Sequence, residues 1–118
     1  MILGINVLVL GYLPAAWQSP LLAKDAFVDP AYWAGIGRTA ERGTLDAIFL
    51  ADGPLLGDPA YDANPIRLEP TVNRGYVAVT ENVGLVATAS TTFNDPFELA
   101  ERLLTVDCLS GGRAGWNV

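Results

Sequence analysis

Four polar side chains of this 118-residue chain lie at or near the ends of apolar runs, where strands would end. They are Asp52, Thr88, Ser90 and Asn117. A carboxylate, two hydroxyls and an amide can hydrogen-bond the polar edge of a ligand, and the small Ala89 between the hydroxyls would let a flat ring approach the backbone. Each also has a structural interpretation, as the start of a turn before Gly53 (Asp52), ordinary β-propensity (the hydroxyls) or an amide paired with a neighbouring backbone (Asn117). The residue types predict a binding site and leave these alternatives open.

The counts of histidine and cysteine exclude several classes of enzyme. The chain has no histidine and one cysteine, Cys108, which excludes a nucleophile activated by imidazole and a zinc site built from cysteine and histidine. A single thiol cannot form an internal disulfide, which agrees with a reducing compartment. We expect no metal site, because the acidic residues of the loops are scattered and lack the spacing of a calcium-binding loop. They are Asp25, Asp29, Asp58 and Asp62.

The charge and composition of the chain limit its partners. There are 7 Lys and Arg against 13 Asp and Glu, a net charge of −6, and no basic run, so we expect no nucleic-acid partner. Apolar residues make up 51% of the chain and charged residues only 17%, whereas about 25% charged residues is typical of a soluble domain. This balance predicts that other protein covers part of the surface.

The segment Met1–Leu13 is almost entirely apolar and raises the question of a signal peptide. The basic residues that open a signal peptide are missing, because the first basic residue is Lys24. Asn6 interrupts the run, which is also shorter than the roughly 20 residues that span a bilayer. We therefore interpret it as a buried strand, and we expect a cytoplasmic protein without a membrane segment.

Four apolar runs alternate with three segments of helical spacing. The runs are Ile2–Leu10, Leu45–Ala51, Val83–Ala89 and Ala114–Val118. Each helical segment opens with a proline after an acidic residue, which is typical of helix starts; the pairs are Asp29-Pro30, Glu69-Pro70 and Asp95-Pro96. The resulting order β-α-β-α-β-α-β predicts an α/β fold with parallel strands.

The faces and the ends of the helices follow from the same spacing. The apolar stripes are Trp33, Ile36, Gly37 and Ala40; Val72, Tyr76 and Val79; and Leu99, Leu103 and Val106. Gly43, Gly84 and Gly111-Gly112 are predicted to end the helices in the left-handed conformation.

Long loops follow the first two predicted strands, at Gly11–Val28 and Asp52–Leu68. Ligands bind at the carboxyl ends of parallel strands, so the predicted site lies on that side of the sheet. Tyr12 and Trp17 would either wall a pocket there or pack over it. The turn Ser110–Arg113 contains two glycines but follows a helix and precedes a strand, the reverse of the nucleotide-binding order. We predict a structural turn on the opposite side.

Five fragments in chain order carry a recognisable pattern: Ala15-Ala16-Trp17, Thr39–Gly43, Leu50–Gly53, Leu85–Thr92 and Leu109–Val118. Together they resemble the luciferase-like monooxygenases, in the branch of the nitrilotriacetate, dibenzothiophene-sulfone and long-chain alkane monooxygenases. That family folds as a (β/α)8 barrel of the TIM type. The resemblance implies that residues 1–118 are a single partial domain, the N-terminal part of such a barrel from its first to its fourth strand. The unpaired strands at both ends predict association, including a homo-oligomer.

The resemblance implies flavin monooxygenation. Enzymes of this kind bind reduced FMN supplied by a separate NAD(P)H:flavin reductase, and the flavin reacts with O2 to give a C4a-(hydro)peroxide that oxygenates a small organic substrate. Asp52, Thr88, Ser90 and Asn117 are then the residues expected to contact the flavin. The phosphate site of such barrels is commonly built by the loops after strands 7–8, so we expect the 118-residue chain alone to be inactive.

The chain departs from the pattern of this branch at a few positions, and two other functions remain open. Gly11–Pro14 replaces a histidine-rich stretch, Cys108 stands where the family often has histidine, and Arg74-Gly75 interrupts the second predicted helix. One alternative is a non-catalytic half-barrel that acts only as an assembly or interaction fragment. The other is a small flavodoxin-like domain, for which Gly11–Pro14 is a poor phosphate-binding loop.

Overall fold

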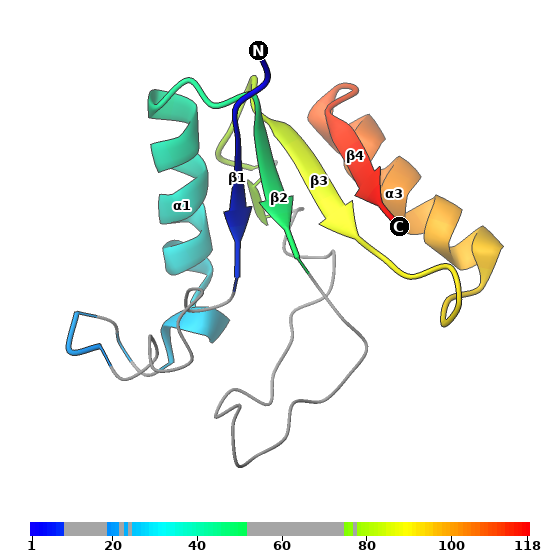
Figure 1. Cartoon of the computed structure of the whole chain (residues 1–118), viewed down its shortest axis with the longest axis horizontal. Coiled ribbons are helices and arrows are strands. Elements are labelled where there is room, and N and C mark those ends of the chain that lie inside the picture. Colours follow the sequence, from blue (N-terminus) through cyan, green and yellow to red (C-terminus); the bar gives the residue numbers. More distant parts are fainter. Residues whose placement is uncertain (9–18, 22, 24, 52–74, 77) are drawn as a thin grey trace.

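The computed structural model describes residues 1–8, 19–21, 23, 25–51, 75–76 and 78–118. The strands are β1 (Gly4–Val7), β2 (Ala47–Leu50), β3 (Gly84–Thr88) and β4 (Ala114–Asn117). The helices are the 3-10 turn η2 (Ala26–Val28), α1 (Pro30–Arg42) and α3 (Pro96–Ser110). All four strands run parallel in one sheet of order β1-β2-β3-β4 (Figure 1). Each lies within one of the predicted apolar runs, so the prediction of an α/β fold with parallel strands is confirmed.

Helices α1 and α3 begin at the predicted acidic-proline pairs. The Asp29 carboxylate accepts a hydrogen bond from the N–H of Ala31 at 2.9 Å. The Asp95 carboxylate caps α3 in the same way, and in both helices the proline occupies the first turn, where its missing N–H costs nothing. Glu69-Pro70 and Val72 lie outside the described residues. Of the stripe predicted there, Tyr76 is helical and buried as expected, whereas Val79 lies in a turn, so the predicted helix does not extend to it.

The two glycines that follow α3 behave as predicted, whereas the prediction for Gly43 is wrong. Gly111 and Gly112 have φ angles of 71° and 90°, and the N–H of Gly111 caps the end of α3. Gly43 has a φ of −76°, and the left-handed conformation falls on Thr44, with a φ of 52°. Gly43 lies close to the last turn of α1 instead, since a Cβ there would be 3.3 Å from the carbonyl oxygen of Thr39.

The prediction that Gly84 ends a helix is also wrong, because Gly84 is the first residue of β3. Its N–H donates to the carbonyl oxygen of Asp46 at 2.8 Å, and a Cβ at Gly84 would lie 3.1 Å from that same oxygen. The absence of a side chain therefore allows the close approach of β2 and β3.

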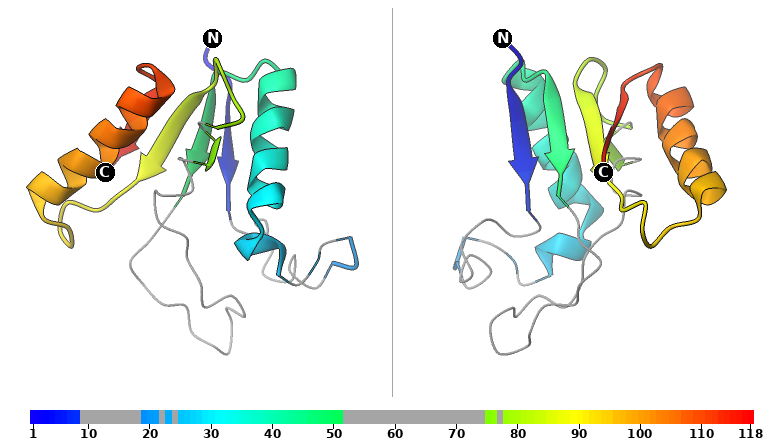
Figure 2. Two further views of the ribbon diagram at one scale, coloured as in Figure 1. Left: turned by 180° about the vertical axis from the view of Figure 1, so that it is seen from behind. Right: turned by 45° about the vertical axis from the view of Figure 1, so that its right-hand side comes forward.

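The strand register divides the side chains between two faces of the sheet, because paired residues of parallel strands share a face and successive residues alternate. One face carries the core: strand residues such as Ile48 and Leu85 are buried together with Trp33 of α1 and Val106 of α3. Both helices therefore lie on one side of the sheet (Figure 2). The predicted stripes of α1 and α3 are confirmed by the burial of Trp33, Gly37, Ala40, Leu99 and Val106.

The other face of the sheet is free of helices in the part of the chain that the structure describes. Its register positions are Gly4, Asn6, Ala47, Phe49, Gly84, Val86, Thr88, Gly115 and Asn117. In a (β/α)8 barrel the helices lie outside and this face lines the interior. A Cβ at Gly115 would lie 3.0 Å from the Cγ2 atom of Val86, so the face is closely packed between β3 and β4.

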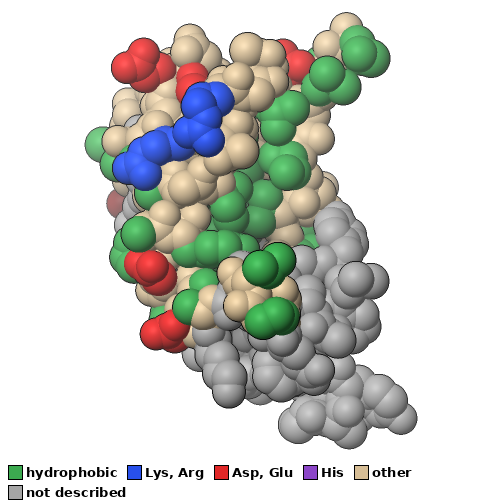
Figure 3. All heavy atoms as spheres, turned by 90° about the vertical axis from the view of Figure 1, so that its left-hand side faces the viewer, with side chains coloured by type: hydrophobic (Ala, Val, Ile, Leu, Met, Phe, Trp, Pro, Cys, Tyr) green, Lys and Arg blue, Asp and Glu red, His purple; other side chains and the backbone are tan. Residues whose placement is uncertain are grey.

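Apolar side chains are exposed along both outer strands of the sheet. Leu3 and Ile5 are exposed at β1, and Trp116 and Val118 at β4. From the side of α1, hydrophobic side chains reach the surface between charged ones (Figure 3). Among the described residues, no strand pairs with the outer edge of β1 or of β4. Within this same part of the chain, no helix is both long enough and apolar enough to cross a bilayer.

A network around Arg113 joins α3 to the segment before β3. Its guanidinium donates to the carbonyl oxygens of Ser110 at 2.8 Å, Val83 at 2.7 Å and Thr80 at 2.9 Å, and to the hydroxyl of Thr80 at 3.0 Å. The hydroxyl of Ser110 accepts from the N–H of Arg113 at 3.1 Å. The turn lies at the end of the sheet opposite the strand carboxyl ends, and these contacts confirm that it is structural.

A second contact at this end of the sheet uses Glu41, the last but one residue of α1. One carboxylate oxygen accepts from the side-chain amide of Asn82 at 2.8 Å and from its backbone N–H at 2.9 Å, and the other from the N–H of Val83 at 3.4 Å. These hydrogen bonds hold the pKa of Glu41 below its usual value despite partial desolvation, and the bond from the Asn82 side chain has the largest effect.

We predict a pH-dependent loss of stability in Glu41→Gln. A carboxyl whose pKa is lowered by folding stabilises the folded state above its unfolded pKa of about 4.3, and that contribution disappears as pH falls through the lower folded pKa. The variant should lose about 0.5–1 kcal/mol at pH 7, since solvent screens a partly exposed carboxylate. Urea unfolding of both proteins should show that the difference in their free energies of unfolding shrinks below about pH 4, near the unfolded pKa. Glu101→Gln on α3 is the control, and a difference that is the same at both pH values would contradict the prediction.

Candidate functional site

Thr88 and Asn117 are the last residues of β3 and β4 and lie opposite each other in the register. Nδ2 of Asn117 donates to Oγ1 of Thr88 at 3.2 Å. The ladder continues one step further, where the N–H of Ala89 donates to the carbonyl oxygen of Asn117 at 3.0 Å. Both side chains therefore occupy the carboxyl end of the sheet, on the face that the described helices leave free.

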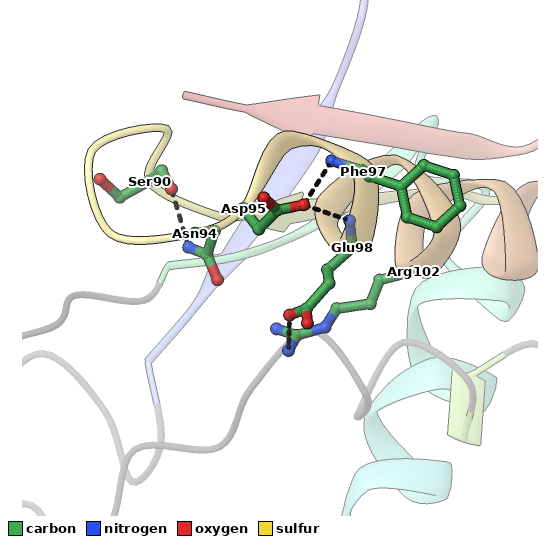
Figure 4. Close-up of polar contacts among 6 residues, drawn as sticks. All are labelled: Ser90, Asn94, Asp95, Phe97, Glu98 and Arg102. Carbon is green, nitrogen blue, oxygen red and sulfur yellow. Dashed lines mark hydrogen bonds and ion pairs between the residues drawn. The ribbon is translucent and has the colours of Figure 1, made fainter.

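Ser90 follows in the segment that leads from β3 to α3. Its hydroxyl accepts from the N–H of Thr92 at 3.2 Å. Its carbonyl oxygen accepts from Nδ2 of Asn94 at 2.7 Å (Figure 4). Nε1 of Trp116 donates to the carbonyl oxygen of the preceding residue, Ala89, at 2.9 Å. The backbone of Ala89-Ser90 is thus held from the side of β4 and from the side of α3.

Asp52 lies outside the described residues, as do Tyr12 and Trp17. The strand that precedes Asp52, β2, is described and pairs with β3 as far as Leu50 and Ala87. Three of the four predicted site residues can therefore be placed: Thr88, Ser90 and Asn117 come from adjacent elements at one end of the sheet.

The hydrogen-bonding capacity of these three side chains is only partly used. The hydroxyls of Thr88 and Ser90 accept hydrogen bonds, and in the described part of the chain neither donates one. Among the described residues, Asn117 uses one of its two N–H groups, and its Oδ1 accepts no hydrogen bond. None of the three is charged, so the arrangement can bind and orient a neutral polar edge but offers no general base. No group of three acidic or cysteine side chains that could hold a metal occurs among the described residues.

Two residues of this region were not singled out from the sequence as individual contacts, Asn94 and Trp116. Trp116 donates a hydrogen bond to Ala89, the residue that follows β3, and only the strand register reveals that contact. Asn94 directly precedes the helix cap Asp95, and asparagine before a helix is typical of a turn that closes through its side chain. That signal could have identified Asn94, although not its partner.

The family model of the luciferase-like monooxygenases matches residues 10–118. The chain belongs to this family. Among its relatives is the N-acetyl-S-(2-succino)cysteine monooxygenase of Bacillus subtilis, which is 40% identical over 98% of the chain. The nitrilotriacetate monooxygenase component A of Aminobacter aminovorans is 39% identical over 100% of the chain. Dibenzothiophene-sulfone and long-chain alkane monooxygenases also match, which confirms the branch identified from the sequence.

Solved structures share the fold of the chain. EDTA monooxygenase from Chelativorans sp. superimposes over 99% of the chain with a TM-score of 0.90 and 31% identity. A riboflavin lyase crystallised with modified FMN and riboflavin covers 98% of the chain with a TM-score of 0.78 and 30% identity. The chain corresponds to 29% and 28% of these proteins and to 26% and 29% of the two relatives above. The four parallel strands and their helices are thus part of a TIM-type barrel.

Membership of the family shows the class of chemistry that its relatives carry out. The relatives are named monooxygenases, and enzymes of this family generally depend on reduced flavin. The expected family and fold are therefore confirmed, while the activity of this chain and the roles of Asp52, Thr88, Ser90 and Asn117 stay predictions.

Proposed function

We propose that Thr88, Ser90 and Asn117 form one wall of the flavin site of an FMN-dependent monooxygenase. The observation that carries the proposal is the placement of the hydrogen-bonded Thr88–Asn117 pair, with Ser90 beside it, at the carboxyl end of β3 and β4. Parallel α/β folds bind their ligands at this end. Asp52, which comes just after β2, is proposed as a further flavin contact.

The donor set fits the polar edge of a flavin ring. That edge carries carbonyl oxygens and a ring N–H. The O–H groups of Thr88 and Ser90 and the Oδ1 of Asn117, which no described residue occupies, can match them. The uncharged side chains suit a ring edge rather than a phosphate. When bound, reduced FMN supplies the reaction with O2 that oxygenates a small organic substrate. The residues of this chain bind and orient the ring.

The proposal includes a separate NAD(P)H:flavin reductase that delivers reduced FMN. It is supported by the name of one relative, nitrilotriacetate monooxygenase component A, which denotes one part of a system of several components. We further propose that the reaction takes place in the cytoplasm, in line with a single cysteine and no disulfide.

We propose that residues 1–118 act as one partial domain. Oxygenation by a TIM-type barrel enzyme needs further strands and loops besides the four described strands. The phosphate site of TIM-type barrels is commonly formed after strands 7–8, whereas the structure describes a sheet of four strands. We therefore expect the 118-residue chain to bind flavin weakly and not to oxygenate substrate unaided.

Titration of the isotopically labelled chain with FMN, followed by amide NMR, tests the proposal. The expected result is that signals of Thr88, Ser90 and Asn117 shift, and that riboflavin, which lacks the phosphate, shifts the same signals. Gly111 and Gly112, at the opposite end of the sheet, serve as internal controls and should not respond. No shift at Thr88–Ser90, or equal shifts at both ends, would contradict the proposal.

A second candidate is a non-catalytic half-barrel that acts only by assembly with itself or another chain. It is favoured by the unpaired outer edges of β1 and β4 among the described residues and by the exposed apolar side chains beside them. Size-exclusion chromatography over a range of concentrations distinguishes the two functions. A homo-oligomer whose elution does not change when FMN is added would support assembly. A monomer with a sharp, cooperative unfolding transition would count against it.

A further inference from the structure

In the segment between β3 and α3, residues 90–94 form a polar turn that is closed by side-chain hydrogen bonds. The side-chain amide of Asn94 donates to the carbonyl oxygen of Ser90 at 2.7 Å, the shortest contact of Ser90. The N–H of Thr92 inside this turn donates to the Ser90 hydroxyl at 3.2 Å. Both Ser90 and Asn94 are only partly buried, so the turn contributes little to the core.

Asn94 connects this turn to the start of a helix. The next residue, Asp95, caps α3 with one carboxylate oxygen that accepts from the N–H of Phe97 at 2.9 Å and of Glu98 at 3.2 Å (Figure 4). The Glu98 carboxylate lies 3.7 Å from Arg102 one turn further on. The first turn of α3 is thus well fixed, and Asn94 extends from it toward Ser90.

The Ser90 backbone is held from a second direction as well. Trp116 of β4 donates to the carbonyl oxygen of Ala89, and the N–H of Ala89 donates to Asn117. With Asn94 on the other side, both carbonyl oxygens of Ala89-Ser90 accept a side-chain donor. Two directed bonds on adjacent peptide groups leave the Ser90 Cα–Cβ bond with one orientation.

We propose that Asn94 is a positioning residue that holds the hydroxyl of Ser90 in place for the flavin. This inference rests on the flavin site proposed above. The hydroxyl accepts from Thr92 and donates to none of the described residues, so its O–H is available to a ligand. Asn94 orients that donor before the ligand binds, so less ordering is needed on binding.

A double-mutant cycle for FMN binding tests the inference. Asn94→Ala should weaken binding about fivefold, as expected for one neutral hydrogen bond. In the Ser90→Ala background the same change should have no further effect, because Asn94 acts through the hydroxyl. Thr91→Ala, an exposed change in the same segment, is the matched control and should bind like the unaltered protein. Equal losses from Asn94→Ala in both backgrounds would show a merely structural role and overturn the inference.

A second measurement needs no flavin. Hydrogen exchange at the N–H of Thr92 reports whether the turn is closed, and Asn94→Ala should speed it about tenfold while Thr91→Ala leaves it unchanged. Asn94→Asp, which has the same shape but turns a donor into an acceptor, should behave like Asn94→Ala. Unchanged exchange in both variants would overturn the inference. If Thr92 exchange responds but no protein binds FMN, the positioning of Ser90 stands and the proposed flavin site fails.

Discussion

Arg113→Ala should lower the free energy of unfolding by about 2–4 kcal/mol, since the change removes a charged, partly buried donor and leaves its acceptors unpaired. The guanidinium joins the carbonyl oxygens of Thr80 and Val83, in the segment before β3, to that of Ser110 at the end of α3. Thr80 is 6% exposed, so water has little access to the oxygen atoms left behind. Urea unfolding at pH 7 measures the loss.

Two further variants separate geometry from charge in this network. Arg113→Lys keeps the charge but replaces a planar fork of donors with one ammonium group, which cannot reach the three carbonyl oxygens together. It should recover less than half of the loss. Arg38→Ala removes an exposed arginine of α1 and should change stability by no more than about 0.5 kcal/mol. An Arg113→Ala protein as stable as Arg38→Ala would contradict the role assigned to the turn.

The elements of the fold could be predicted from the sequence because their signals are local. Asp29 and Asp95 each precede a proline, and each caps the helix that follows. The conformations of the glycines are harder to predict, because the residue that ends a helix often has a positive φ but need not be glycine. Thr44 takes that conformation, and Gly43 is instead set by crowding against α1. Such contacts arise only once the chain is folded.

The candidate site was predictable as a list of residues but not as an arrangement. Thr88 and Asn117 meet because β3 and β4 pair in the register Leu85 to Ala114. A slip by one residue would move one of the two side chains to the helical face and separate them. Nothing in either strand alone determines that register. The Trp116 bond to Ala89 depends on it as well, which is why that contact emerges only from the structure.

Asn117→Ala should weaken FMN binding about 10- to 30-fold, and Thr88→Val about tenfold, in the flavin site proposed above. Thr88→Val preserves the shape of the side chain and the β-propensity of the strand, so it removes the hydroxyl and little else. Asn117→Ala removes both the flavin contact and the donor that orients the Thr88 hydroxyl at 3.2 Å, which is why its expected effect is larger. Quenching of flavin fluorescence during titration measures both dissociation constants.

The hydrogen bond between Asn117 and Thr88 also predicts how the two substitutions combine in a double variant. Because Asn117 Nδ2 donates to Thr88 Oγ1, each single change already disrupts the pair, and the double variant should bind FMN more tightly than the product of the two single effects predicts. Thr105→Val is the matched control, since it removes a hydroxyl that donates within α3, to the carbonyl oxygen of Glu101. The control should bind FMN as the unaltered protein does. Strictly multiplicative effects would mean that the two side chains act independently, and unchanged binding in Thr88→Val would remove its hydroxyl from the flavin site.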